Sequence, residues 1–286
     1  MLEYLLITIA LIICVIGSIT DLRIREVPDW LNLTGILIGI FVHAIGSVMT
    51  LNGWFFLESI FGLGIAFLIG SLMYYGGQWG GGDTKLLTAV GALLGFSINI
   101  NNLFVSVLIF SVVIGAFYGL IWSFVLAIKH WKQFSHSFNN LMKAPLMLLL
   151  QKILLASLFM GVIVTSFLEE YMLKIITASF LIGIPIFIWL FFCIKAVELS
   201  CMIKSVSPFI VTEGDWIAKE VVVDGKRICG PKDLGITKEQ LGLLQKFARQ
   251  KKIRNVIIKI GIPFVPTFLF ALIAALLFNN PLLLLL

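Results

Sequence analysis

The chain has 286 residues, of which 60% are hydrophobic and only 13% are charged. Because a soluble domain is normally about 25% charged, this composition excludes an ordinary soluble protein and indicates an integral membrane protein. The formal charge of +6 is better explained by Lys and Arg gathered on the cytoplasmic membrane face than by a nucleic-acid partner. The four cysteines form neither a C-x-x-C pair nor a His-paired spacing, so we expect no metal site.

Eight apolar segments follow one another along the chain and predict about eight transmembrane helices. They cover residues 4–20, 30–49, 54–75, 84–96, 103–128, 153–167, 175–194 and 260–278. The first segment has no basic region before it and no small-x-small cleavage site after it, so we expect a retained helix rather than a signal peptide. Glycine pairs at GxxxG spacing predict close helix contacts, and they are Gly35/Gly39, Gly91/Gly95 and Gly115/Gly119.

The fourth segment is short for a membrane span. Its 13 residues, at about 1.5 Å of rise each, give roughly 20 Å against a hydrocarbon core of about 30 Å. Either Asp83 therefore lies below the membrane surface at the start of the helix, or the helix continues irregularly through Ser97–Asn102.

The polar residues 195–259 predict a small folded α+β cytosolic insert before the last helix. Glu220–Ile228 is a candidate hairpin with Asp224-Gly225 as its turn, and Thr237-x-x-Gln240 is a capping box that opens a helix. Pro263-x-x-Pro266 breaks the first turn of the last segment, which gives either a simple kink or an edge that helps to hold an extended peptide. We therefore expect an all-α membrane protein with a membrane domain at 1–194, a cytosolic domain at 195–259 and a last helix at 260–286.

The distribution of basic residues predicts the orientation in the membrane. If the N-terminus is external, every one of the 21 Lys and Arg residues except Lys174 falls on the cytoplasmic side. We expect this orientation in a multi-pass protein of the cell membrane, with both termini external.

This orientation places two acids at the same face of the membrane. Asp21 ends the first segment, and Asp83 begins the fourth segment directly after Gly80-Gly81-Gly82. Glycines let the backbone adopt unusual conformations and let another chain approach closely. Asp83 also suits a helix N-terminus as an ordinary dipole-favoured acid, whereas Asp21 at a helix C-terminus is disfavoured. Both interpretations, a paired acid site and two ordinary helix-end acids, remain open at this point.

Two stretches resemble the type IV prepilin peptidases and archaeal preflagellin peptidases, which are membrane aspartyl proteases of the GxGD type. One is Asp21-Leu-Arg-Ile-Arg-Glu-Val-Pro28-Asp29, and the other begins Gly80-Gly-Gly-Asp83-Thr-Lys85. The resemblance covers about residues 1–130 and implies that Asp21 and Asp83 are the catalytic aspartates. The chain lacks the N-terminal four-cysteine zinc loop of bacterial members, so we expect the archaeal type, without methylation of the product.

The resemblance also implies a substrate and a mechanism. The expected function is removal of a short basic leader from pilin- or flagellin-like precursors at the cytoplasmic face, without metal or cofactor. Two close carboxyl groups share one proton, so that one acts as base and the other as acid. Gly80, Gly82 and Lys85 are candidates for positioning the substrate. An equally good interpretation of Lys85 is an ordinary helix-end lysine, whose aliphatic chain lies along apolar surface while its ammonium group reaches water.

Three other functions fit parts of the sequence. A presenilin-like protease also has GxGD but carries its aspartates on consecutive late helices. A proton-linked transporter also has acids on membrane helices, normally near the midplane. A membrane assembly factor that docks a partner on residues 195–259 would tolerate loss of either aspartate. Of partners, the sequence indicates the precursor proteins and the lipid bilayer, and no nucleic acid.

Overall fold

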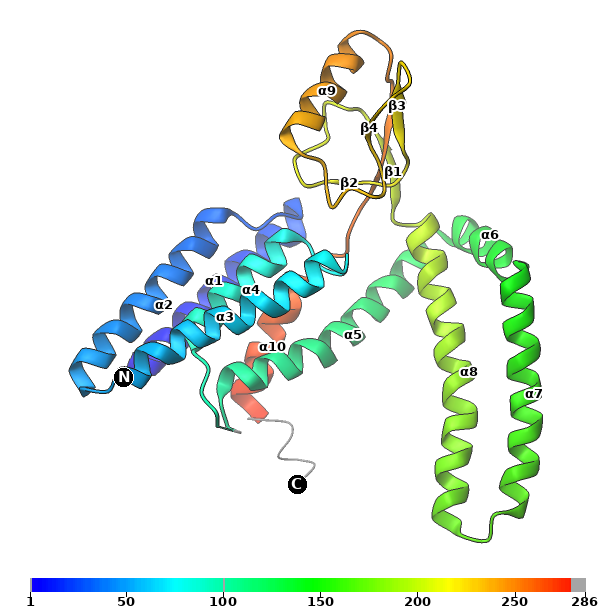
Figure 1. The fold of residues 1–286 in the computed structure, drawn as a ribbon, viewed down its shortest axis with the longest axis horizontal. Coiled ribbons are helices and arrows are strands. Elements are labelled where there is room, and N and C mark those ends of the chain that lie inside the picture. Colours follow the sequence, from blue (N-terminus) through cyan, green and yellow to red (C-terminus); the bar gives the residue numbers. More distant parts are fainter. Residues whose placement is uncertain (1, 100, 279–286) are drawn as a thin grey trace. The chain divides into compact units, whose positions relative to one another are not determined.

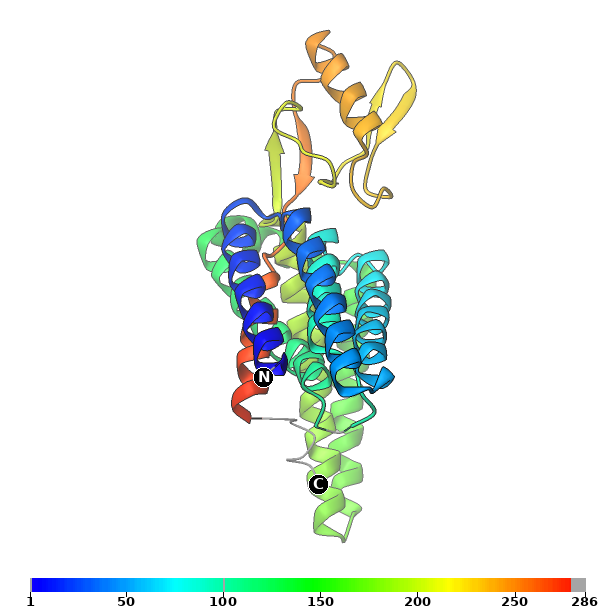
Figure 2. The same cartoon turned by 90° about the vertical axis from the view of Figure 1, so that its left-hand side faces the viewer.

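The computed structural model describes residues 2–99 and 101–278. These residues form ten helices and five short strands, and Figures 1 and 2 show how the elements follow one another along the chain. The helices are α1 (Leu2–Ile24), α2 (Asp29–Thr50), α3 (Gly53–Tyr75), α4 (Gly81–Leu94), α5 (Leu103–Lys129), α6 (Trp131–Met142), α7 (Pro145–Phe167), α8 (Tyr171–Ser200), α9 (Lys238–Arg249) and α10 (Val265–Phe278). The strands are β1 (Ile203–Val206), β2 (Trp216–Ile217), β3 (Val221–Val223), β4 (Lys226–Cys229) and β5 (Val256–Lys259).

The predicted all-α membrane fold with a small insert is confirmed. Each of the eight apolar segments forms a helix, and α1, α2, α3, α5, α7 and α8 are long and apolar enough to cross a membrane. The helices α4 and α10 have 14 described residues each, which is about 21 Å. The count of eight transmembrane helices therefore stays a prediction.

Several predicted boundaries are wrong. Gly95, whose φ is +68°, ends α4 after Leu94, so the helix does not continue through Ser97–Asn102. Residues 261–264 are not helical, and α10 begins at Val265 rather than Ile260, because Pro263 and Pro266 interrupt the backbone donors there. The amphipathic α6 lies between the predicted segments 103–128 and 153–167, and α7 begins eight residues earlier than expected, at Pro145.

The chain divides into two compact units. The described residues of Met1–Gly119, Ser207–Arg254 and Gly261–Leu286 form the first unit, and Leu120–Val206 with Asn255–Ile260 forms the second. The division at 1–194, 195–259 and 260–286 stays a prediction. In the second unit, β1 and β5 pair antiparallel from Ile203↔Lys259 to Val206↔Val256.

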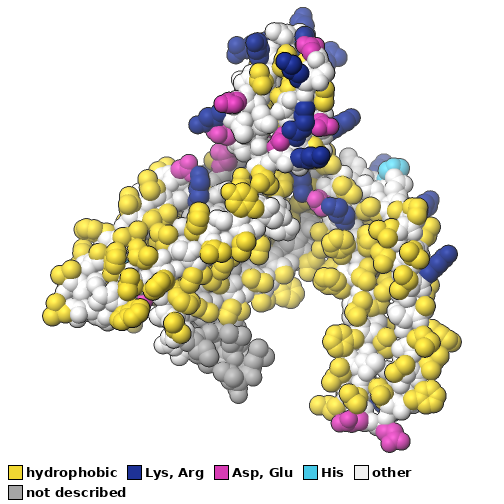
Figure 3. All heavy atoms as spheres, in the orientation of Figure 1, with side chains coloured by type: hydrophobic (Ala, Val, Ile, Leu, Met, Phe, Trp, Pro, Cys, Tyr) yellow, Lys and Arg dark blue, Asp and Glu magenta, His cyan; other side chains and the backbone are white. Residues whose placement is uncertain are grey.

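The insert of the first unit forms as the sequence indicates. The strands β3 and β4 make an antiparallel hairpin, and the turn residues Asp224 and Gly225 have φ values of 51° and 75°. The helix α9 opens with the expected capping box, since Thr237 and Gln240 bond to each other's backbone N–H. Lys and Arg side chains gather on this insert, whereas hydrophobic side chains cover the visible surface of the helices (Figure 3).

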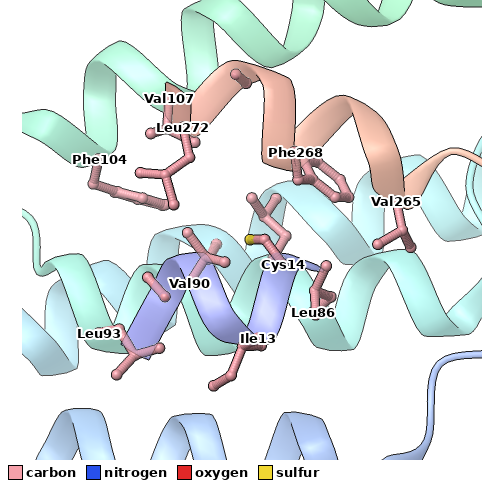
Figure 4. Packing of buried hydrophobic residues seen from close by; sticks show 14 of the residues in the cluster. Ile13, Cys14, Leu86, Val90, Leu93, Phe104, Val107, Val265, Phe268 and Leu272 are labelled. Atoms are coloured by element: carbon pink, nitrogen blue, oxygen red, sulfur yellow. The ribbon is translucent and has the colours of Figure 1, made fainter. Parts of the chain in front are cut away.

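The short helix α4 lies at the centre of the first unit. Its side chains from Leu86 to Leu93 are nearly all buried, and it packs against α1, α2, α3 and α10. Figure 4 shows Leu86, Val90 and Leu93 of α4 in one cluster with side chains of α1, α5 and α10. A helix that is apolar all round, as α4 is after its first turn, is expected to be enclosed in this way.

Small residues allow the neighbours of α4 to approach closely. A Cβ added at Gly62 of α3 would lie 2.1 Å from the carbonyl oxygen of Gly91, and one at Gly39 of α2 would lie 2.6 Å from that of Ala92. The predicted contact is therefore confirmed for Gly35, Gly39 and Gly91. It is wrong for Gly119, whose added Cβ meets nothing within 4 Å.

The contact between Gly62 and Gly91 generates a stability prediction. Gly62→Ala should lower the free energy of unfolding by about 1–3 kcal/mol, because the methyl group would force α3 away from α4. Reversible unfolding in detergent would measure this change. The matched control is Gly64→Ala on the same helix, where an added Cβ meets nothing within 4 Å, and its stability should not fall. Equal stability of the two variants would contradict the close contact.

Candidate active site

Asp21 lies in the last turn of α1, because the helix continues to Ile24 instead of ending at Thr20. Its side chain is 6% exposed, and its Oδ2 accepts a hydrogen bond of 3.0 Å from the backbone N–H of Val265. That N–H belongs to the first turn of α10, where backbone donors have no partner within their own helix. The carboxyl group therefore fixes the end of α1 to the start of α10.

Asp83 lies in the first turn of α4 and is 9% exposed. Its Oδ2 accepts a hydrogen bond of 2.8 Å from the backbone N–H of Gly80. This is half of a capping box, since Gly80 has no side chain to return the bond. A Cβ added at Gly82 would lie 3.4 Å from Val27, in the loop after α1. The glycine stretch therefore brings the two predicted motifs into contact.

The packing of α1 on α4 brings the two helix ends that carry the acids together. Gly35 of α2 contacts both Ile13 and Ala89, and Gly17 contacts Leu86, so the residue numbers on α4 fall as those on α1 rise. The two helices are therefore antiparallel. One further turn along each leads from Gly17 to Asp21 and from Leu86 to Asp83, and the two carboxyl groups lie within electrostatic range of each other.

In each carboxyl group, one of the two oxygens takes no part in the hydrogen bonds described above. Among the described residues, the Oδ1 atoms of Asp21 and Asp83 have no hydrogen bond, and neither belongs to the fully buried, unpartnered atoms. Both groups are fixed through Oδ2 by neutral backbone donors and present the other oxygen. Two carboxyls in this arrangement can share a proton and act as a general acid and a general base.

Lys85 does not face the pair. Its Nζ forms an ion pair of 2.5 Å with Oδ1 of Asp29 at the start of α2, and the two side chains are 55% and 78% exposed. The aromatic residues beside the glycine stretch are better enclosed: Trp79 contacts Phe264 and Phe268 with ring centroids 5.5 and 5.3 Å apart. These three rings link the segment before Gly80 to the start of α10, where the backbone N–H of Val265 bonds to Asp21.

The sequence interpretation missed Val265 as a partner of Asp21. The signal was present in Pro263-x-x-Pro266, because prolines that break a first helical turn also mark where free backbone donors begin. Nothing in the sequence links this motif to a residue 244 positions away, so the sequence alone predicts only a kink or a peptide-holding edge.

Residues 8–127, a range that contains both aspartates, match the model of the type IV leader peptidase family. This part of the chain is therefore similar to the type IV leader peptidase family. It is 35% identical over 95 residues to a prepilin peptidase of Methanothermobacter thermautotrophicus, which is 33% of this chain and 24% of the relative. It is 34% identical over 94 residues to a preflagellin peptidase of Methanococcus maripaludis, which is 33% of this chain and 39% of the relative.

A further relative is the preflagellin peptidase of Methanocaldococcus jannaschii, with 33% identity over 79 residues, 28% of this chain and 33% of the relative. The chain thus spans between about a quarter and two fifths of the length of the curated relatives it matches. No solved structure matches it significantly. These peptidases are archaeal, in agreement with the expected type.

The cap at Gly80 generates a second stability prediction. The free energy of unfolding of Asp83→Ala should be about 1 kcal/mol lower than that of Asp83→Asn, because only the amide oxygen of Asn can still accept the hydrogen bond from the Gly80 N–H. Both variants remove the same charge, so the difference isolates the cap. Chemical unfolding of the purified proteins in detergent would measure it, and equal stabilities would show that the cap contributes nothing.

Proposed function

We propose that this protein is a membrane aspartyl endopeptidase that removes the basic leader peptide from prepilin- or preflagellin-like precursors. The observation that carries the proposal is the position of Asp21 and Asp83 at adjoining ends of the packed helices α1 and α4, within the stretch that matches the leader peptidase family. The relatives named as prepilin and preflagellin peptidases support the reaction and the substrate class. A presenilin-like protease or a transporter has no comparable support.

The proposed reaction needs only the two carboxyl groups and water. The ionised aspartate takes a proton from water while the water oxygen bonds to the scissile carbonyl carbon. The protonated aspartate gives its proton to the carbonyl oxygen, so a neutral tetrahedral diol forms. When the C–N bond breaks, one diol hydroxyl returns a proton to the second aspartate, and the first gives its proton to the leaving amine. Both groups then have their original protonation.

The backbone around Asp83 supports a role in holding an extended substrate. Gly80 and Gly82 have no side chains, so a peptide strand can approach their backbone closely. Lys85 is exposed beside them and forms an ion pair with Asp29, so its exposed ammonium group is accessible to a substrate chain. We assign these three residues to substrate positioning and not to the chemical step.

The proposed orientation has the N-terminus outside and the aspartates near the cytoplasmic face, at the junction where a basic leader meets the apolar helix of a precursor. The support is the charge bias. Glu169 and Glu170 lie in the loop between α7 and α8, and Lys174 lies in the first turn of α8, whereas the other Lys and Arg residues fall in segments that we expect on the opposite side.

Cysteine labelling tests this orientation. In a variant without the four native cysteines, Glu169→Cys should react with an impermeant maleimide in intact cells, whereas Lys232→Cys in the insert should react only after permeabilisation. The reverse pattern would overturn the orientation without affecting the assignment of the aspartates.

Cleavage of a pilin-like precursor tests the reaction. Asp21→Asn and Asp83→Asn should each reduce cleavage at least about 1,000-fold, because an amide neither gives nor takes the required proton. Membranes or purified protein would be incubated with precursor, and the N-terminus of the product would be sequenced. Glu26→Gln is the matched control, an exposed acid in the loop directly after α1, and should keep cleavage within about threefold of wild type.

In the same experiment, Lys85→Met should raise KM and leave kcat unchanged if Lys85 positions the substrate. An unchanged KM would leave Lys85 as a partner of Asp29 alone. Full cleavage by either aspartate variant would refute the proposed aspartyl mechanism, and no cleavage by a folded wild-type protein would refute the substrate class.

A further inference from the structure

Asn32 is the most unusual polar residue of the helical core. Its side chain in α2 is 2% exposed, and both Oδ1 and Nδ2 lack a hydrogen-bond partner among the described residues. A buried amide without partners is costly, and nearly all buried polar groups in native proteins are hydrogen-bonded. Asn32 thus requires a ligand that the surrounding side chains do not supply.

The packing places Asn32 about one helical turn from the two aspartates. It belongs to the buried stripe of α2 that continues with Gly35 and Gly39. Gly35 contacts Ile13 of α1 and Ala89 of α4, with added-Cβ distances of 2.8 and 3.0 Å. One turn toward the start of α2 therefore brings Asn32 to the layer in which Gly17 contacts Leu86. That layer is one turn from Asp21 and Asp83.

The direction of the side chain brings the amide closer still. Side chains on a helix tilt toward its N-terminus, and α2 begins at Asp29, beside the loop in which Val27 lies against Gly82. The amide of Asn32 therefore leans from the Gly17–Leu86 layer toward the two carboxyl groups. The opposite direction leads to Gly35 and Ile13, which offer only apolar contacts.

The chemistry of the amide identifies its ligand. Oδ1 accepts a hydrogen bond and Nδ2 donates one, so the ligand must both donate and accept. A buried water molecule does both and typically makes about three hydrogen bonds to polar groups that have no other partner. The Oδ1 atoms of Asp21 and Asp83 are acceptors without a bond among the described residues.

We propose that Asn32 binds a buried water molecule and, through it, positions the Oδ1 atoms of the aspartate pair. Asn32 is then a positioning residue and not a catalytic one, and its effect on the reaction rests on the proposed function. A peptide group of the substrate has the same donor and acceptor chemistry, but a side chain that is 2% exposed is closed to a peptide.

Two variants of matched shape separate hydrogen bonding from packing. Asn32→Val removes both polar atoms, whereas Asn32→Thr has nearly the same shape and restores a hydroxyl that donates and accepts. Thr34→Val is the control, because it makes the same exchange on the exposed side of α2, where the hydroxyl bonds only the carbonyl of Leu31. All would be compared with wild type in precursor cleavage and in thermal unfolding.

Asn32→Val should lower kcat about tenfold, the loss expected for one buried hydrogen bond, with KM within twofold of wild type and no loss of thermal stability. Asn32→Thr should recover at least a third of the wild-type kcat, and Thr34→Val should match wild type. A wild-type kcat in Asn32→Val, or equal losses in Asn32→Val and Asn32→Thr, would overturn the positioning role. A rise in KM alone would assign Asn32 to the substrate instead.

A second measurement does not depend on activity. A high-resolution map of the wild-type protein should show water density within hydrogen-bonding distance of both amide atoms of Asn32 and of one aspartate Oδ1. A dry amide, or one bonded to another side chain, would overturn the proposal. If the wild-type protein cleaves no precursor, the proposed function fails, while the map still decides whether Asn32 binds water beside the pair.

Discussion

The position of the aspartate pair depends on the close approach of α3 and α2 to α4. A helix of 14 residues has little surface for packing against its neighbours, and its first turn carries Asp83. Close backbone contacts at Gly62 and Gly91 fix α4 against α3, and a contact at Gly39 fixes it against α2. Its side chains Leu86, Val90 and Leu93 pack in one apolar cluster with side chains of α1, α5 and α10 (Figure 4). Because lipid provides little hydrophobic drive between helices, such close packing has to supply the stability. The start of α4 is then fixed relative to α1, whose Gly17 contacts the same layer.

Much of this arrangement was readable from the sequence. Hydropathy identified each apolar helix, the capping box at Thr237 and the turn at Asp224-Gly225 predicted the folded insert, and GxxxG spacing identified Gly35, Gly39 and Gly91 as contact points. These signals are local, and each has a single physical cause. The charge bias and the helix ends also predict that Asp21 and Asp83 share one membrane face, and this stays a prediction.

What the sequence did not reveal depends on contacts between distant segments. The pairing of β1 with β5 joins strands that flank the whole insert, and neither strand alternates clearly enough to predict it. The bond from Val265 to Asp21 joins the two ends of the first unit. Asn32 looked like an ordinary polar residue in an apolar helix, because its burial results from α1 and α4 together. The matched family region ends at residue 127, so the contribution of α10 lies outside it.

The hydrogen-bond donors to the two carboxyl groups also affect the chemistry of these groups. A salt bridge to Lys or Arg would favour the charged form of a carboxylate and oppose its protonation. Both acids are instead held by neutral backbone N–H groups, from Val265 and from Gly80. The nearby cations are bound elsewhere: Lys85 pairs with Asp29, and the guanidinium of Arg25 donates to the carbonyl of Gly261. A neutral donor fixes the geometry of a carboxyl group in either protonation state. The proposed reaction requires this freedom, because each aspartate has to gain and lose a proton in every cycle while its position stays the same.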